Sequence, residues 1–415
     1  MNSKRFQTSL SAVVSVVGLS VSLTIPAFAN SQGADFYKGK TVTYIVATAP
    51  GGSYDTYGRV VADFMQKYLP GSTFVVKNVP GAGHLIGANT LYASKADGLT
   101  IGTFNTGLIY NQMTGREGVK FDLEKMSWIG KAASDPRVVM VAANSPFSSF
   151  DDLRKSKAQV NFGASGVGSA SFVESTVLID ALSLPIKLIS GFNGNEGEMA
   201  IRRGEVAGII GSRSSLEPFV KNGYGKFIAQ MGGKEKDVPQ LSSLVTDPKG
   251  KSLIALIETQ GEIARLTAAP PGIPKERLEA LRAAYKSAME DKGLKARMEK
   301  IGLPLDPAYG DDVLKRVRAA LDQSPETVAL LGKTLNIKDP ILKAEGPLLE
   351  VGDKGREIAF AGHDGQKVKS KPSGSRTQIT IAGKEAKRED LKAGLNCEVN
   401  YKSGGDNEPM TIVCK

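Results

Sequence analysis

The chain has 415 residues, of which 41% are apolar and 23% are charged, with a formal net charge of +10. A length of this order predicts two or three domains rather than one hydrophobic core. The positive charge is spread thinly along the chain, whereas nucleic-acid-binding proteins cluster their basic residues on one face. Composition therefore favours an ordinary globular protein and argues against a nucleic-acid partner.

The first 29 residues predict a secretory signal peptide. Lys4 and Arg5 precede an apolar run from Leu10 to Ile25, and Pro26–Ala29 ends in a small-x-small pattern. The alternative is a membrane anchor, but serines interrupt the run, and about 20 apolar residues are needed to span a bilayer. We expect cleavage near Ala29 and export to the periplasm, and no later segment has the length and apolarity of a membrane span.

From Lys40 onward, short β-rich runs alternate with helical stretches, which predicts α/β units with mostly parallel sheets. The chain leaves the first group of units near residue 138 and returns near 264, so we predict two lobes with a cleft between them. Lobe 1 comprises 30–137 and 265–337, lobe 2 comprises 138–264, a linker covers 338–375, and a small β module covers 376–415. The expected strands are 41–47, 74–78, 99–104, 138–143, 159–163, 187–190, 206–211, 377–383, 396–401 and 410–414; the expected helices are about 56–68, 85–94, 170–182 and 275–300, with a short one opening near 149 and another ending at 204.

Five glycine-rich turns follow predicted strands, and a helix follows most of them. They are 49–55, 80–87, 105–107, 164–169 and 191–195. Glycines alone only permit tight turns, but helix N-termini and free backbone N–H groups also favour an anion. Five such turns in two similar units suggest a carboxylate pocket built from amides and from the hydroxyls of Ser53, Thr106, Ser165 and Ser169.

Three side chains have competing interpretations. Asp55 fits a helix cap better than a direct ligand, because a bare carboxylate repels an anionic solute. Arg213, just past a predicted strand, is either a counter-charge for the solute or a solvated surface arginine. Trp128 is expected in the core rather than as a stacking platform.

Enzyme and cofactor motifs are incomplete. The stretch 81–87 has the spacing GxGxxxG, with Ile86 where a dinucleotide-binding loop needs its third glycine. The stretch 163–168, GASGVG, lacks the final glycine of a nucleophile elbow. Only His84 and His363 are present, with no cysteine before Cys397, so we expect no cofactor and no metal site. An exported hydrolase acting on a small anionic substrate stays open as the alternative to a binding protein.

The two cysteines, Cys397 and Cys414, lie in two predicted strands of the tail. An even pair in an exported protein predicts a disulfide. Pairing Tyr401 with Met410 in an antiparallel hairpin sets the two cysteines opposite each other.

Several stretches resemble the solute-binding receptors of tripartite tricarboxylate transporters, the Bug family. They read KTVTYIVATAPGGSYDTYGR, VVKNVPGAGHLIGANTLY, ADGLTI, NFGASGVGSASFVES and GFNGNEGEMAIRRGEVAG. The resemblance covers roughly Asp35 to Leu335. It implies a two-lobed periplasmic-binding-protein fold (type II-like) that closes on a carboxylated solute, is no enzyme, and delivers the solute to an inner-membrane permease. The tail after Lys338 is not part of the usual receptor of this family.

The resemblance also implies which turns face the ligand: 49–55, 81–85, 105–106, 165–169 and 192–195. Two of them depart from the family pattern, because His84 replaces a glycine and Phe192–Asn195 differs from the commoner Tyr-Lys-Gly form. We expect a monomer. The predicted ligand-binding residues are Gly51, Gly52, Ser53, Asp55, Gly83, His84, Asn105, Thr106, Ser165, Gly166, Ser169, Asn193 and Arg213.

Overall fold

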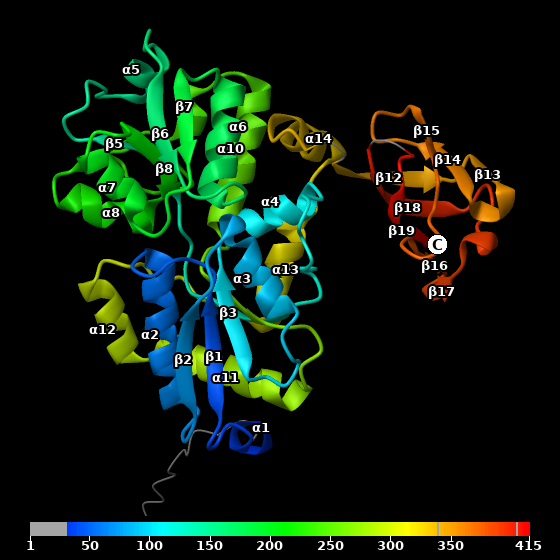
Figure 1. Cartoon of the computed structure of the whole chain (residues 1–415), viewed down its shortest axis with the longest axis horizontal. Helices are drawn as coiled ribbons and strands as arrows, with labels where there is room; N and C mark the ends of the chain where they lie inside the picture. The colour runs from blue at the N-terminus through cyan, green and yellow to red at the C-terminus, as the bar shows by residue number, and fades with distance from the viewer. Residues whose placement is uncertain (1–30, 338–339, 404–405) are drawn as a thin grey trace, which may run out of the picture.

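The computed structural model describes residues 31–337, 340–403 and 406–415, so the predicted signal peptide lies outside the described residues. Figure 1 shows two α/β lobes, one above the other, and a smaller β-rich module beside them. Within the described ranges, no helix is both long enough and apolar enough to cross a membrane.

The first lobe is built on a six-stranded sheet with the order β11-β4-β10-β3-β1-β2. Helices α2 and α11 pack against each other and bury Tyr44, Tyr57, Leu281 and Tyr285 in one core cluster. Trp128 of β4 is 1% exposed, so the prediction that it belongs to the core is confirmed. The elements are β1 (Thr41–Val46), β2 (Thr73–Asn78), β3 (Thr100–Phe104), β4 (Ser127–Lys131), β10 (Leu266–Ala269), β11 (Ala308–Tyr309), α1 (Ser31–Asp35), α2 (Ser53–Lys67), η1 (Ala82–His84), α3 (Leu85–Tyr92), α4 (Gly107–Met113), α11 (Lys275–Glu290), α12 (Lys292–Lys300) and α13 (Gly310–Leu321).

The predicted single helix over 275–300 is two helices. Asp291 is extended and caps α12, accepting hydrogen bonds from the backbone N–H groups of Gly293 at 2.6 Å and Leu294 at 3.3 Å. A side-chain acceptor at this position offers the backbone an alternative to continuing the first helix. The apolar periodicity crosses the break, which is why the sequence pattern does not reveal it.

The second lobe is built on a five-stranded sheet with the order β7-β6-β8-β5-β9. Apolar residues cover both of its faces: Phe162 and Ile210 pack toward α6, and Met140 and Ile209 pack toward α7 and α8. The elements are β5 (Arg137–Ala142), β6 (Val160–Ala164), β7 (Ile186–Ser190), β8 (Gly208–Ser212), β9 (Gly225–Met231), α5 (Phe150–Arg154), α6 (Ala170–Leu182), α7 (Glu196–Arg202), α8 (Arg213–Lys221), α9 (Leu241–Leu244) and α10 (Pro248–Gly261).

Most strands of each sheet run in one direction, as predicted, but both sheets are mixed. β1 pairs in parallel with β2 and β3, and β6 with β7 and β8, but β5 and β10 run antiparallel to their neighbours. The reason is the crossing between lobes. Arg137, the first residue of β5, pairs with Ser212 at the end of β8, and Leu266 of β10 pairs with Phe104 at the end of β3. Each crossing strand therefore enters at the edge where the parallel strands end, and this edge faces the other lobe.

The expected linker is wrong, because most of 338–375 is folded into the C-terminal module. β12 pairs along its whole length with β18, and β14 pairs with both β13 and β15. The segment lacks a sustained period because its strands are short. The module strands are β12 (Ile341–Pro347), β13 (Glu350–Gly352), β14 (Glu357–Ala361), β15 (Lys367–Ser370), β16 (Gln378–Ile381), β17 (Lys384–Ala386), β18 (Asn396–Lys402) and β19 (Pro409–Cys414), with the short helices η2 (Asp353–Gly355) and η3 (Arg388–Asp390).

Helix α14 (Pro325–Thr334) joins the lobes to this module. It was expected in the first lobe, but it packs against α6 of the second lobe and against β12. The Thr334 hydroxyl donates to Asp180 Oδ2 of α6 at 3.1 Å. Figure 1 shows α14 between the second lobe and the module.

The predicted disulfide is confirmed. Cys397 of β18 lies opposite Cys414 of β19, their Cα atoms are 4.0 Å apart, and they are bonded through sulfur. The predicted register is wrong at one position. Tyr401 pairs with Pro409 instead of Met410, because the register shifts between Asn400 and Tyr401.

Candidate functional site

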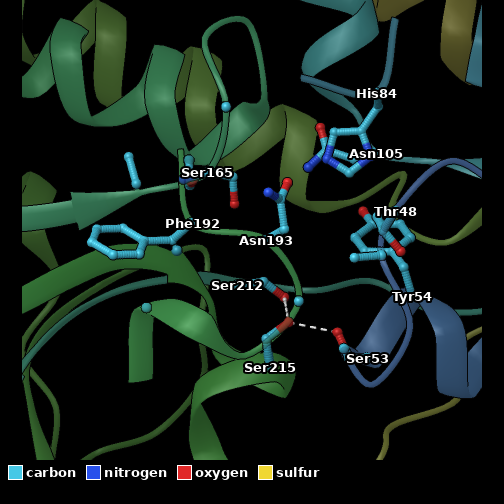
Figure 2. A pocket seen from close by; sticks show the side chains of 18 of the residues that line it. Thr48, Ser53, Tyr54, His84, Asn105, Ser165, Phe192, Asn193, Ser212 and Ser215 are labelled. Atoms are coloured by element: carbon cyan, nitrogen blue, oxygen red, sulfur yellow. Dashed lines mark hydrogen bonds between the residues drawn. The ribbon is translucent and has the colours of Figure 1, made fainter. Parts of the chain in front are cut away.

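A cleft lies between the lobes, at the edges where the parallel strands of both sheets end (Figure 2). Its walls are the turns that follow β1, β2 and β3 on one side and β6, β7 and β8 on the other. The first lobe supplies Ala47, Thr48, Ala49, Gly52, Ser53, Tyr54, Pro80, Gly81, Gly83, His84 and Asn105. The second supplies Arg137, Gly163, Ala164, Ser165, Gly166, Ser171, Phe192, Asn193, Gly194, Gly197, Glu198, Ile209, Gly211, Ser212, Ser215 and Leu216.

Most of the predicted ligand residues line this cleft. Figure 2 shows Ser53 and His84 facing Ser165 and Asn193 from the opposite lobe. The members of the predicted set in the lining are Gly52, Ser53, Gly83, His84, Asn105, Ser165, Gly166 and Asn193. Contact of these residues with a solute stays a prediction.

Asp55 does not line the cleft, and it is not the cap of α2. The helix begins at Ser53 with Gly52 as its N-cap, so Asp55 lies in the first turn. Its carboxylate accepts hydrogen bonds from Arg59 Nε at 3.0 Å, Asn78 Nδ2 at 2.9 Å and the Gly51 N–H at 3.1 Å. Burial raises the pKa of Asp55, but these donors outweigh it and hold the pKa below its ordinary value. Asp55 therefore fixes the glycine turn that forms the cleft wall.

Three more predicted ligand residues lie outside the lining: Gly51, Thr106 and Ser169. Each has a structural role instead. Gly51 has a φ of +91°, which a glycine adopts without strain. The Ser169 hydroxyl caps α6 by accepting from the Phe172 N–H at 3.3 Å. Thr106 is fully buried, and its hydroxyl accepts from Arg137 Nη2 at 3.2 Å.

Arg213 is neither the counter-charge nor a solvated surface residue. Its Nε lies 3.3 Å from Glu217 Oε2, and its guanidinium stacks 4.9 Å from the centre of the Phe227 ring. It lines a different depression with Pro136 and Asp306, away from the cleft. Arg213 is the first residue of α8. Its side chain therefore points away from the cleft, whereas one interpretation of the sequence placed it at a strand end facing the solute.

The cation in the cleft is Arg137, which sequence reasoning missed. Among the described residues of the lining it is the only lysine or arginine. Arg137 Nε lies 2.9 Å from Glu174 Oε2, and both side chains are almost completely buried. Burial lowers the pKa of Arg137, but the Glu174 carboxylate raises it further, so the guanidinium stays charged. The sequence did contain a signal for this pair. Arg137 is a single arginine at the start of an apolar strand, and Glu174 is a single glutamate in an apolar stretch of helix.

Helix α2 opens at the cleft without a side-chain cap, because its N-cap is Gly52. Uncapped N-terminal N–H groups and the helix dipole favour an anion. The start of α8 is different, because Asp135 Oδ1 accepts from the Ser214 N–H at 3.0 Å and a carboxylate already lies there. Arg137 and the start of α2 therefore give the cleft its positive character.

His84 and Glu198 are the other charge-bearing candidates of the lining. His84 is 9% exposed, and burial lowers its pKa to about 4, so the imidazole is neutral near pH 7. Glu198, which the sequence analysis did not select, lies in the first turn of α7. Burial raises the pKa of the Glu198 carboxyl to about 7.

A buried cluster joins the cleft to both crossings between the lobes. Asp135 of the first crossing pairs with Arg265 of the second, and Ser212 hydrogen-bonds to both. The Arg265 guanidinium lies 3.9 Å from the centre of the Tyr54 ring, which lines the cleft. Movement of the lobes about these crossings therefore shifts groups that line the cleft.

No observation favours the hydrolase alternative. A serine nucleophile needs a base within hydrogen-bonding reach. Within the described part of the chain, the Nδ1 of His84 has no hydrogen-bond partner, and the serines of the cleft bond to one another instead, Ser53 to Ser215 and Ser215 to Ser212.

Comparison with known proteins agrees with this architecture. Residues 57–332 match the tripartite tricarboxylate transporter family receptor. A relative from Pseudomonas sp. strain P51, the UPF0065 protein in the tcbD-tcbE intergenic region, is 23% identical over 69% of this chain and 85% of its own. The solved structure of periplasmic binding protein BugD covers 72% of this chain and 99% of its own, with 21% identity and a TM-score of 0.61. MatC from Rhodopseudomonas palustris, solved with bound malate, covers 71% and 99%, with 18% identity and a TM-score of 0.58.

The two-lobed fold is that of periplasmic binding proteins, and the family match makes the chain a solute-binding receptor. The chain belongs to the tripartite tricarboxylate transporter receptor family. The C-terminal module lies outside the matched residues.

Proposed function

We propose that this receptor binds one small carboxylate-bearing solute in the interlobe cleft and delivers it to the permease subunits of a tripartite transporter. The observation that carries the proposal is Arg137, the buried cation of the lining, which shares the cleft with several hydroxyls and with the uncapped start of α2. A carboxylate is well matched to a guanidinium and to helix N-termini. MatC, a structural neighbour, was solved with malate.

The location and the assembly are part of the same proposal. Residues 1–29 act as a signal peptide cleaved near Ala29, and the mature receptor works in the periplasm as a monomer. The apolar run 10–25 and the Ala27-Phe28-Ala29 pattern support this. Mass spectrometry of the N-terminus of periplasmic protein measures the cleavage position, and light scattering measures the oligomeric state.

Thermal-shift measurement against a carboxylate panel tests the proposed solute class. A ligand at 100 times its dissociation constant stabilises a receptor by about 2.7 kcal/mol, which gives a clear upward shift of Tm. The panel contains mono-, di- and tricarboxylates, aromatic acids and acidic amino acids. Neutral analogues, in which each carboxylate is an amide, are the control. An unmoved Tm with every acid would contradict the proposed solute class.

A further inference from the structure

We infer that Glu198 makes the cleft selective for a carboxylate whose far end carries a hydrogen-bond donor, such as a hydroxyl or an ammonium group, over a solute with a second carboxylate at that end. The inference rests on the proposed function, and it narrows the class of solute. It is carried by the placement of Glu198, by its lack of a partner in any other described residue, and by the charge of Arg137 that Glu174 already balances.

Glu198 is held at the cleft by the packing of its helix. Gly197, the residue before it, is buried, and a Cβ built on Gly197 would lie 2.9 Å from Ile209 Cδ1 and 3.7 Å from Phe192 Cβ. This close approach fixes the first turn of α7 against the end of the second sheet. The Glu198 side chain is half-buried in the lining, beside the apolar wall that Phe192 and Ile209 form.

The carboxylate of Glu198 has no partner in another residue. Among the described residues, the one donor that acts on it is its own backbone N–H. The other acidic side chains nearby are engaged: Glu196 accepts from the Asn193 N–H at 2.6 Å, and Glu174 is paired with Arg137. A half-buried carboxylate with no donor from another residue is under-satisfied, and a solute that brings a donor reduces this cost.

Arg137 and Glu198 approach the cleft from opposite faces of the second sheet. Arg137 lies with Glu174 on the face that α6 covers, whereas α7 covers the face that carries Ile209. A solute that reaches both groups therefore presents its carboxylate toward Arg137 and its other end toward Glu198.

Charge balance decides what that other end is. The Glu174 carboxylate already offsets the charge of Arg137, so the guanidinium offers one carboxylate a directed contact but little excess positive charge. A second carboxylate near Glu198 would face a like charge or force one of the two groups to take up a proton. A hydroxyl or an ammonium group donates to the Glu198 carboxylate instead, and a charge-assisted hydrogen bond of this kind is a strong one.

Titration calorimetry at pH 8 with matched acids tests the inference. Each triplet has the same carbon chain and differs only at one end; for four carbons it is 4-aminobutyrate, 4-hydroxybutyrate and succinate, and shorter and longer triplets cover other sizes. The proteins are the wild type, Glu198→Gln, and Glu205→Gln as a control. Glu205 is an exposed residue of the same lobe that pairs with Arg203, outside the cleft lining. Thermal melts establish that both variants fold.

We expect the wild type and Glu205→Gln to bind the best amino or hydroxy acid at least tenfold more tightly than the matching dicarboxylate. In Glu198→Gln this ratio falls at least tenfold, because the neutral amide accepts more weakly and no longer repels a carboxylate. Equal ratios in wild type and Glu198→Gln, with binding retained, overturn the inference and leave the proposed function intact. Failure of every acid to bind the wild type overturns both.

Discussion

The hydroxyl of Ser53, at the start of α2, is hydrogen-bonded to the hydroxyl of Ser215 in α8, with 2.5 Å between the oxygens, and this bond joins the two lobes across the cleft (Figure 2). A second link lies at the other side, where Asn105 Oδ1 accepts from the Ala170 N–H at 3.1 Å. The turns that line the cleft therefore also hold the lobes together. The proposed solute site and the contacts between the lobes therefore share the same residues.

Replacing Ser215 by alanine removes the hydrogen bond to Ser53. A hydrogen bond contributes about 0.5–1.5 kcal/mol net, so closure becomes weaker by this amount. If the solute binds the closed form, its affinity falls about two- to tenfold. Calorimetry measures the affinity, and small-angle X-ray scattering of the solute-free protein measures the more open average shape.

The control is Ser243→Ala. The Ser243 hydroxyl donates to the Gln240 carbonyl oxygen in α9, away from the cleft. This variant keeps the affinity and the scattering profile of the wild type. A Ser215→Ala protein that is indistinguishable from this control would show that the serine bond does not contribute to closure.

Two glycines of the cleft are predicted to tolerate no side chain without loss of binding. A Cβ on Gly52 would lie 3.2 Å from Gly194 Cα, and one on Gly166 would lie 3.3 Å from the Gly83 nitrogen. Both contacts are with the opposite lobe, and neither glycine has a positive φ. We expect Gly52→Val and Gly166→Val to fold but to bind the solute at least tenfold more weakly, about 1.4 kcal/mol.

Gly352→Val is the matched control. Gly352 is in the C-terminal module, its φ is −117°, and a Cβ there would meet only Glu357 at 4.0 Å. Calorimetry and thermal melts are compared for all three variants. Wild-type affinity in both cleft variants would place the solute elsewhere.

Variants of the Arg137–Glu174 pair distinguish an effect on solute binding from an effect on folding stability. Arg137→Gln alone leaves the buried Glu174 carboxylate without its partner, which typically costs 3–5 kcal/mol of stability. The double variant Arg137→Gln/Glu174→Gln removes both charges, so we expect it to regain most of this stability but to bind the solute at least tenfold more weakly. Denaturant unfolding gives the stability, and calorimetry gives the affinity. Unchanged affinity in the folded double variant would remove Arg137 from the solute site.

Reduction of the Cys397–Cys414 disulfide should destabilise the C-terminal module alone. The two cysteines are 17 residues apart, and the chain-entropy estimate for a loop of this length is about 3 kcal/mol at most. Ile341 of the module packs close to Gly115 of the first lobe, but both cysteines lie in β18 and β19, away from the cleft. Scanning calorimetry with and without reductant measures the effect.

Solute affinity is measured on the same reduced samples. We expect no change, because the lobes contain no cysteine. Loss of affinity on reduction would mean that the module supports the cleft. A free-thiol assay on the untreated periplasmic protein should find no reactive thiol.

Affinity for a donor-bearing solute should rise with pH near neutrality. The pKa of Glu198 in the free receptor is raised to about 7 by burial, so the carboxyl is protonated below this value and ionised above it. An ionised carboxylate accepts more strongly, so affinity for an amino or hydroxy acid increases from pH 6 to pH 8, by roughly tenfold at most. Affinity for the matching dicarboxylate decreases over the same range.

The other ionisable side chains of the lining keep their state in this range. His84, with a pKa of about 4, stays neutral, and burial raises the pKa of Tyr54 above its ordinary value, so it stays protonated. Arg137 stays charged. Glu174, which lies outside the lining and is bonded to Arg137, is a second carboxyl whose pKa burial raises to about 7. The Glu198→Gln variant should therefore lose the pH dependence that residue 198 causes, and Glu174 accounts for any that remains. An unchanged profile in this variant would assign the pH dependence to another group.

Local patterns in the sequence were sufficient for the elements and for most of the cleft wall. Apolar β-rich runs located β1 and β3, and the helical stretch after residue 169 located α6. Glycines after strands located the turns around Gly52, Gly83 and Gly166. Such features depend on neighbours in the chain, through side-chain periodicity and the backbone freedom of glycine. The disulfide was also accessible, since two cysteines allow only one pairing.

Only the tertiary structure decided which charges reach the cleft. Arg137 and Glu174 are 37 residues apart and meet because β5 and α6 both pack against β8, while Arg213 lies outside the cleft at the start of α8. The strand direction of β5 and β10 depends on the crossings between lobes, and β12 finds its partner β18 some fifty residues later. These outcomes depend on contacts between distant segments. The sequence around a buried charged residue does not indicate which distant residue it pairs with.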